Sequence, residues 1–144
     1  MTAEYFLDTN VVAYAASARS EDAAKTAIAR RLLLADSVGT SAQVLQEFFV
    51  VATRKFQPPL SIAAAELYLD ALERLPVAPL TTGLVHLAIR IQERYQLSYW
   101  DAAILAAAKE LAATVVYSED LNDGQAYDGV TVINPFRPGA TLPA

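Results

Sequence analysis

The most constraining feature of the sequence is a carboxylate placed inside an apolar helix. Residues 98–108 begin with Ser98 and continue into a run of alanine, isoleucine and leucine in which Asp101 is the only charge. At 100° per residue, Asp101 lies in line with Ile104 and Leu111, at the middle of the apolar stripe. Removing an ionised carboxylate from water costs on the order of several kcal/mol unless a counter-charge or hydrogen bonds compensate it. The fold must therefore supply such compensation.

A local explanation for Asp101 is a capping box. In the pattern Ser98-x-x-Asp101, the serine hydroxyl accepts from the amide of residue 101, and the acid reaches back to the amide of residue 98. This interpretation needs no function for the carboxylate. It remains open unless other acids gather at the same place.

Length and composition indicate a single domain. We expect residues 1–136 of the 144-residue chain to form it and 137–144 to be a C-terminal tail. With 54% hydrophobic and 19% charged residues, the chain is not disordered. No segment approaches the roughly 18 apolar residues of a membrane span, and the N-terminus lacks the basic start of a signal peptide. The absence of cysteine is compatible with the cytoplasmic location that we expect.

Short apolar strands alternate with amphipathic helices along the chain. Strands are expected at 5–7, 114–117 and 130–133, with minor ones at 38–40 and 76–80. Helices are expected at about 11–16, 20–35, 42–54, 62–75 and 82–95, and from 99 onward. This alternation predicts an α/β fold with a short central parallel sheet covered by helices on both faces. Such sheets place their sites beyond the carboxyl ends of the strands.

Four acids are placed to reach that edge of the sheet. Asp8 ends the first strand, and Asp120 follows the strand at 114–117. Asp101 starts its helix, and Glu47 lies at the border of the apolar face of the helix at 42–54. Each also has a structural explanation. Asp8 is a possible helix N-cap, Glu47 a partner of Arg54, and Asp120 a turn residue.

Four carboxylates at one edge would require cations. Two negative charges about 4 Å apart repel by roughly 4 kcal/mol at an effective dielectric constant of 20. With no cysteine and one histidine, His86, which we assign to a helix surface, the donors are oxygens that suit Mg²⁺ or Mn²⁺. Acid clusters that hold such metals can activate water and bind a phosphate oxygen, which is the arrangement used for phosphodiester cleavage. The net charge of −5 argues against an extended basic surface for nucleic acid.

The four acidic segments together resemble the successive motifs of PIN-domain ribonucleases. These segments are Leu7-Asp8-Thr9-Asn10, Gln43-Val44-Leu45-Gln46-Glu47-Phe48, Ser98-Tyr99-Trp100-Asp101-Ala102-Ala103-Ile104 and Ser118-Glu119-Asp120-Leu121-Asn122. Their order, spacing and the chain length most resemble the toxin half of VapBC toxin–antitoxin pairs. The resemblance extends from Leu7 to Phe136.

This resemblance implies a PIN-like three-layer α/β/α fold and a Mg²⁺- or Mn²⁺-dependent endoribonuclease. Asp8 and Asp101 match the primary metal ligands, and Glu47 matches an acid that binds the metal or orients its water. Asp120 is the favoured fourth acid, with Glu119 and Asp123 as alternatives in the same loop. Accompanying polar positions, which would hold the acids in place, match Thr9, Asn10 and Ser118.

The resemblance also implies an RNA substrate, an antitoxin protein that covers the acidic cleft, and a homodimer. Two alternatives remain at this point. One is a receiver-like domain that accepts a phosphoryl group on an aspartate beside Mg²⁺. The other is a non-catalytic interaction module whose acids serve only as helix caps.

Overall fold

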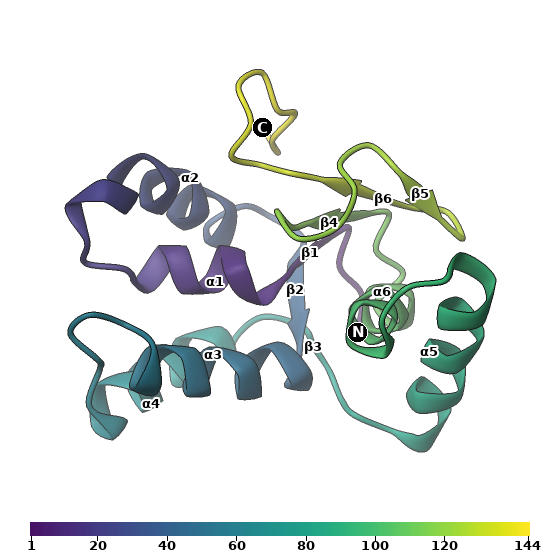
Figure 1. The fold of residues 1–144 in the computed structure, drawn as a ribbon, viewed down its shortest axis with the longest axis horizontal. Coiled ribbons are helices and arrows are strands. Elements are labelled where there is room, and N and C mark those ends of the chain that lie inside the picture. Colours follow the sequence, from purple (N-terminus) through teal and green to yellow (C-terminus); the bar gives the residue numbers. More distant parts are fainter.

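The computed structural model describes residues 1–144 and confirms the predicted α/β fold (Figure 1). A central sheet is flanked by six α-helices. The strands are β1 (Tyr5–Leu7), β2 (Val38–Ser41), β3 (Val77–Ala78), β4 (Val115–Tyr117), β5 (Ala126–Tyr127) and β6 (Val130–Ile133). The helices are α1 (Thr9–Ala16), α2 (Ala23–Leu33), α3 (Ala42–Arg54), α4 (Ile62–Leu72), α5 (Thr82–Tyr95) and α6 (Tyr99–Glu110), with a short 3₁₀ turn at Ser20–Asp22. None of the helices is long and apolar enough to cross a membrane.

The strand order is β3-β2-β1-β4-β6-β5, and all neighbours are parallel except β5 and β6. β1 and β4 are adjacent at the centre, with Leu7 in register with Tyr117. The residues that follow these two strands therefore meet at one edge of the sheet. Those residues are Asp8 and Ser118.

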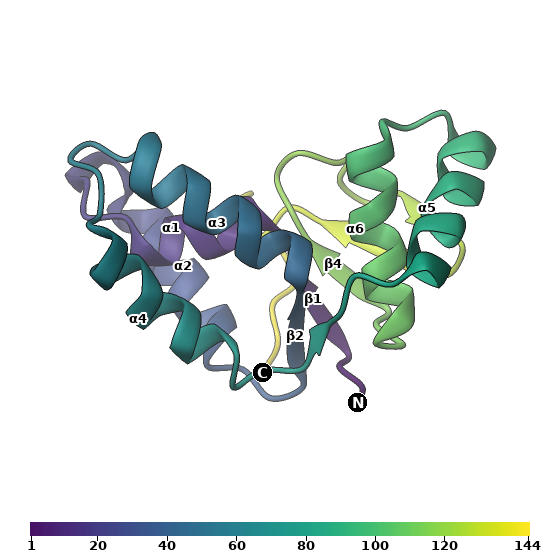
Figure 2. The ribbon, with the colours of Figure 1, turned by 90° about the horizontal axis from the view of Figure 1, so that it is seen from below.

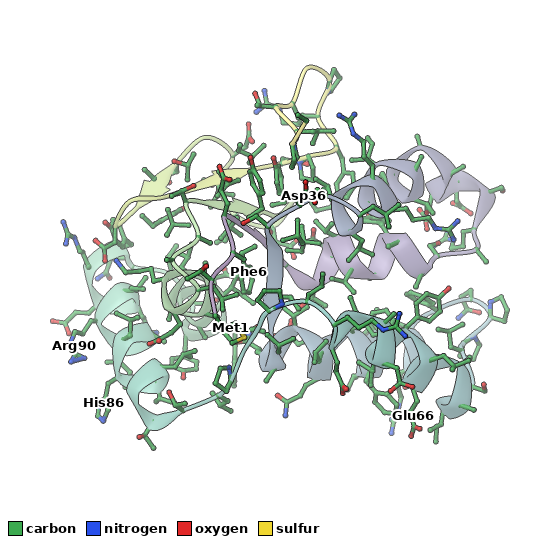
Figure 3. The ribbon with its side chains drawn as sticks, turned by 180° about the vertical axis from the view of Figure 1, so that it is seen from behind. Met1, Phe6, Asp36, Glu66, His86 and Arg90 are labelled. Atoms are coloured by element: carbon green, nitrogen blue, oxygen red, sulfur yellow. The ribbon has the colours of Figure 1, made fainter.

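The helices form groups on either side of the central strands. Figure 2 shows α1 to α4 on one side and α5 and α6 on the other. α6 packs against β2, β4 and β6, and its residues 102–108 are all buried. Phe6 is fully buried in the centre of the molecule, whereas His86 is exposed on the outer side of α5 (Figure 3). His86 is thus a helix surface residue, as expected.

Two local predictions were incomplete. A helix was expected to begin at about residue 20, but Ser20 starts the 3₁₀ turn, and α2 begins only at Ala23. Asp22 accepts a hydrogen bond from the Ser17 hydroxyl (2.7 Å) instead of capping α2. β5 was not predicted, because it has only two residues, yet it forms a hairpin with β6 through Asp128-Gly129. Both turn residues have positive φ (51° and 85°), as this kind of tight hairpin requires.

Gly39 in β2 is a position where a side chain cannot be accommodated. A Cβ there would lie 2.8 Å from Leu111 Cδ1 and 2.9 Å from both Ala3 Cβ and the Pro76 carbonyl. Gly39→Ala should lower the free energy of unfolding by about 2 kcal/mol, measured by urea denaturation. The control is Gly83→Ala in α5, where the added Cβ would have Thr81 Oγ1 as its nearest neighbour, at 3.7 Å. Equal stability of the two variants would contradict this packing.

Candidate functional site

Asp8 is a buried carboxylate at the centre of the sheet edge. Only 5% of its surface is exposed. As the N-cap of α1, its Oδ1 accepts from the Thr9 amide (2.7 Å), and its Oδ2 accepts from the hydroxyl of fully buried Ser118 (2.7 Å). The capping explanation for Asp8 is therefore correct locally. Capping does not explain why the buried residue is an acid, because no positively charged side chain pairs with this carboxylate to offset the cost of burying its charge.

The environment of Asp8 disfavours its ionised form. Burial is the main cause that raises its pKa to about 6, and the negative charges of Asp120 and Glu47 raise it further. The hydrogen bonds from Ser118 and Thr9 act in the opposite direction but are outweighed. Three of the predicted acids thus share one electrostatic environment.

Asn10 connects Asp8 to Asp120. Its amide Nδ2 donates to Asp120 Oδ2 (3.1 Å) and Ser118 Oγ (3.2 Å), and lies 3.4 Å from Asp8 Oδ2. Its Oδ1 accepts from the Glu119 amide (3.3 Å), and Ser118 Oγ accepts from the Asp120 amide (3.1 Å). These bonds fix the start of the 118–123 loop beside α1. The polar residues expected to hold the acids in place are found in contact with them.

Glu47 joins the same network from α3. Its Oε2 accepts from the Thr9 hydroxyl (2.6 Å) and its Oε1 from Gln43 Nε2 (2.7 Å). The expected pairing with Arg54 is not formed. Gln43, one helical turn earlier on α3, was not predicted as a site residue. Its spacing of four residues from Glu47 is the signal that could have identified it.

Asp101 is not bonded into this network. Ser98 Oγ accepts from the Asp101 amide (3.1 Å), so the serine half of the capping box forms. The acid's half does not, because the Asp101 carboxylate accepts no hydrogen bond. Gln43 Nε2, which binds Glu47, also lies 3.4 Å from the Trp100 carbonyl and connects α3 to the first turn of α6. The helix start therefore does not use the charge of Asp101.

The two alternative acids of the 118–123 loop are engaged elsewhere. Glu119 pairs with Lys25 (2.9 Å) and accepts from the Tyr14 hydroxyl (2.9 Å). Asp123 pairs with Arg137 and accepts from the Asn134 amide (2.7 Å). Asp120 is the acid of this loop that contacts the network around Asp8.

This difference gives a matched pair of substitutions. Glu119→Gln should leave any activity of the site within about threefold of wild type, because its carboxylate faces Lys25 and not Asp8. Asp120→Asn should cause a much larger loss, because it removes one of the charges that acts on Asp8. The measurement is the initial rate, for each variant, of the RNA cleavage that the sequence resemblance implies. A larger loss in Glu119→Gln than in Asp120→Asn would contradict the assignment.

The donor set suits a hard divalent cation, since it consists of carboxylate, amide and hydroxyl oxygens. As placed, however, no three of the acids and histidine converge closely enough to share an ion. Thr9, Asn10 and Ser118 lie between them. Three such groups are not needed for Mg²⁺, which proteins commonly hold through one or two carboxylates and several waters.

An open groove of about 760 Å³ lies between α1 and α3, and it is lined in part by residues of the acidic network. Its lining includes Glu47 and Asp120 from the acidic network, and also Arg19 and Lys55. Positive side chains beside an acidic centre suit a ligand that carries several phosphates. The groove is large enough for part of an extended polymer.

Comparisons with known proteins agree with this architecture. The family model of the PIN domain matches residues 5–125. Among solved structures, the chain is similar to VapC20 of Mycobacterium tuberculosis, a toxin that cleaves the sarcin–ricin loop, with 23% identity, a TM-score of 0.64 and coverage of 81% of this chain and 89% of that one. A toxin–antitoxin complex from Klebsiella pneumoniae matches with 20% identity, a TM-score of 0.65 and coverage of 91% and 97%.

A third similar structure is VapBC2 from Rickettsia felis bound to promoter DNA, with 15% identity, a TM-score of 0.60 and coverage of 89% and 96%. Comparison with curated proteins gave no significant match. The identities to solved structures are low and establish the fold alone. The family match covers most of the chain and includes all four acids of the site. The protein belongs to the PIN domain family.

Proposed function

We propose that the protein is a metal-dependent endoribonuclease that acts as the toxin of a toxin–antitoxin pair. The observation that carries the proposal is the buried, unpaired carboxylate of Asp8, with its pKa raised to about 6 beside Glu47 and Asp120. A protein that needed only a helix cap could use serine or asparagine there without this cost. Membership of the PIN family supports nuclease chemistry for such a site.

In this proposal, Asp8, Glu47, Asp101 and Asp120 hold one or two divalent cations, Mg²⁺ or Mn²⁺. The cation, when bound, supplies an activated water and neutralises charge on the phosphate. Thr9 and Gln43 orient the Glu47 carboxylate, and Ser118 and Asn10 orient Asp8 and Asp120. The protein's contribution is thus to position carboxylates whose mutual repulsion favours binding of a cation.

The substrate and partners follow from the similar structures. Their descriptions name a toxin that cleaves the sarcin–ricin loop, a toxin–antitoxin complex and a VapBC complex. We extend these to an RNA substrate, an antitoxin partner and a homodimer for this chain. The receiver-like alternative is disfavoured, because receivers have strand order 2-1-3-4-5, whereas here β1 lies between β2 and β4.

The test of this function is RNA cleavage by the purified protein in the presence of Mg²⁺, Mn²⁺ or EDTA. Cleavage should stop in EDTA and return when Mg²⁺ or Mn²⁺ is added in excess. The reason is that the acidic site has no protein cation of its own. Undiminished cleavage in EDTA, or none under any condition, would contradict the proposal.

A further inference from the structure

Trp100 is an exposed aromatic side chain that precedes Asp101 in α6, and its backbone carbonyl lies 3.4 Å from Gln43 Nε2, which also binds Glu47. Its exposed fraction is 66%, which is high for the largest apolar side chain of the chain. It is also the only large hydrophobic side chain exposed after Ile89. Most of the surface of this residue faces water in the isolated protein, so most of the free energy that its burial could supply is not gained. Packing within the protein therefore does not explain the position of this side chain, and a ligand that covers the ring would.

The backbone of Trp100 is held in place from both sides. On one side, the Ser98 hydroxyl caps the first turn of α6, which contains Trp100. On the other side, the Trp100 carbonyl lies 3.4 Å from Gln43 Nε2, which also binds Glu47. Its ring meets the Tyr99 ring edge to face, with centroids 5.1 Å apart and an interplanar angle of 84°. The ring is thus presented on a fixed helix start, one residue before Asp101.

We propose that Trp100 is a stacking platform for a nucleobase of the RNA, next to the phosphate that is cleaved. This inference rests on the proposed function and assigns the substrate contact on the α6 side of the acidic site. Proteins recognise unpaired RNA by stacking exposed bases on aromatic rings, and every base offers a face for this contact. The stacked nucleotide belongs to a single-stranded segment, because a base paired within a helix does not expose its face.

The surroundings of the ring favour a nucleobase over a second copy of the chain. A protein interface centres its aromatic residues in an apolar patch that excludes water. Around Trp100 the neighbouring residues are Tyr99, whose ring lies edge to face with it, and the polar residues Ser98, Asp101 and Gln43. An aromatic ring with these polar neighbours suits a nucleobase, which has polar edges, better than a water-excluding apolar interface.

The first test is steady-state cleavage of a single-stranded RNA by Trp100→Ala and Trp100→Phe. We expect Trp100→Ala to raise KM about tenfold with kcat little changed, because stacking contributes to binding both substrate and transition state. Trp100→Phe, which retains a ring, should stay within about threefold of wild type. The control Ile89→Ala, which truncates a side chain of 45% exposure on α5, should leave KM unchanged.

The second test uses the fact that Trp100 is the only tryptophan of the chain. In the Asp8→Asn variant, which should bind RNA without cleaving it, a short single-stranded RNA should quench tryptophan emission. A duplex of the same sequence should quench it much less. RNA binding detected by anisotropy without a change in emission would overturn the stacking role.

The outcomes separate this inference from the proposed function. A wild-type protein that does not cleave RNA contradicts the function itself. Active wild-type protein with an unchanged KM in Trp100→Ala overturns the stacking role alone. If that variant also changes from dimer to monomer in size-exclusion chromatography, the ring belongs to an interface between two copies.

Discussion

Asp101→Asn should reduce RNA cleavage at least about a thousandfold while leaving the free energy of unfolding within about 1 kcal/mol of wild type. The Ser98 hydroxyl caps α6 through the Asp101 backbone amide, and the carboxylate makes no hydrogen bond that the fold needs. The measurements are initial cleavage rates and urea denaturation of both proteins.

The matched control for this variant is Ser98→Ala. It removes the cap and should lower the free energy of unfolding by about 1 kcal/mol. It keeps the charge of Asp101, so most of the cleavage should remain. Comparable cleavage by Asp101→Asn and wild type would show that the carboxylate has no catalytic role.

Asp8→Asn should also abolish cleavage, but it should make the metal-free protein more stable at pH 7. Ionisation of Asp8 disfavours the folded state, because burial raises its pKa to about 6 from the ordinary aspartate value of 3.8. This shift corresponds to about 3 kcal/mol at neutral pH. Asparagine remains a good N-cap, although its amide group meets the Asn10 and Ser118 donors less well. A net gain of about 1 to 2 kcal/mol is expected.

The gain should depend on pH. The folded protein binds the Asp8 proton more tightly than the unfolded chain, so wild-type stability should fall as pH rises from about 4 to above 6. Asp8→Asn lacks this ionisation, and its advantage should therefore disappear near pH 4. Denaturation at several pH values in EDTA measures both curves. A wild-type protein whose stability advantage over Asp8→Asn grows with pH would contradict the assignment of Asp8 as a costly buried charge.

The main strands and helices could be predicted because their signals are local. The apolar runs at 5–7 and 115–117 and the helical periodicity of 99–110 are read directly from neighbouring residues. Once the strands are parallel, their ends share one edge, which explains why Asp8 and Asp120 could be placed together. The two-residue β5 was missed, although Asp128-Gly129 carried the hairpin signal.

Side-chain partners distant in sequence could not be predicted. Arg54 was expected to pair with Glu47 because it lies on the same helix, but Thr9 of α1 and Gln43 bind that acid instead. Lys25 holds Glu119 across 94 positions of the chain, and no periodicity encodes this contact. The choice among the three acids of the 118–123 loop therefore depended on tertiary contacts. Likewise, only the structure distinguishes the half-formed cap at Ser98 from a complete capping box.

The central claim is that acids from four separate segments form one site for a divalent cation. Calorimetric titration of Mn²⁺ into wild type, Asp8→Asn, Asp101→Asn and Glu119→Gln tests it most directly. The wild type and Glu119→Gln should bind Mn²⁺ with similar affinity, and the other two variants should bind at least about tenfold more weakly. Equal Mn²⁺ affinity in all four proteins, or no binding by the wild type, would contradict the claim.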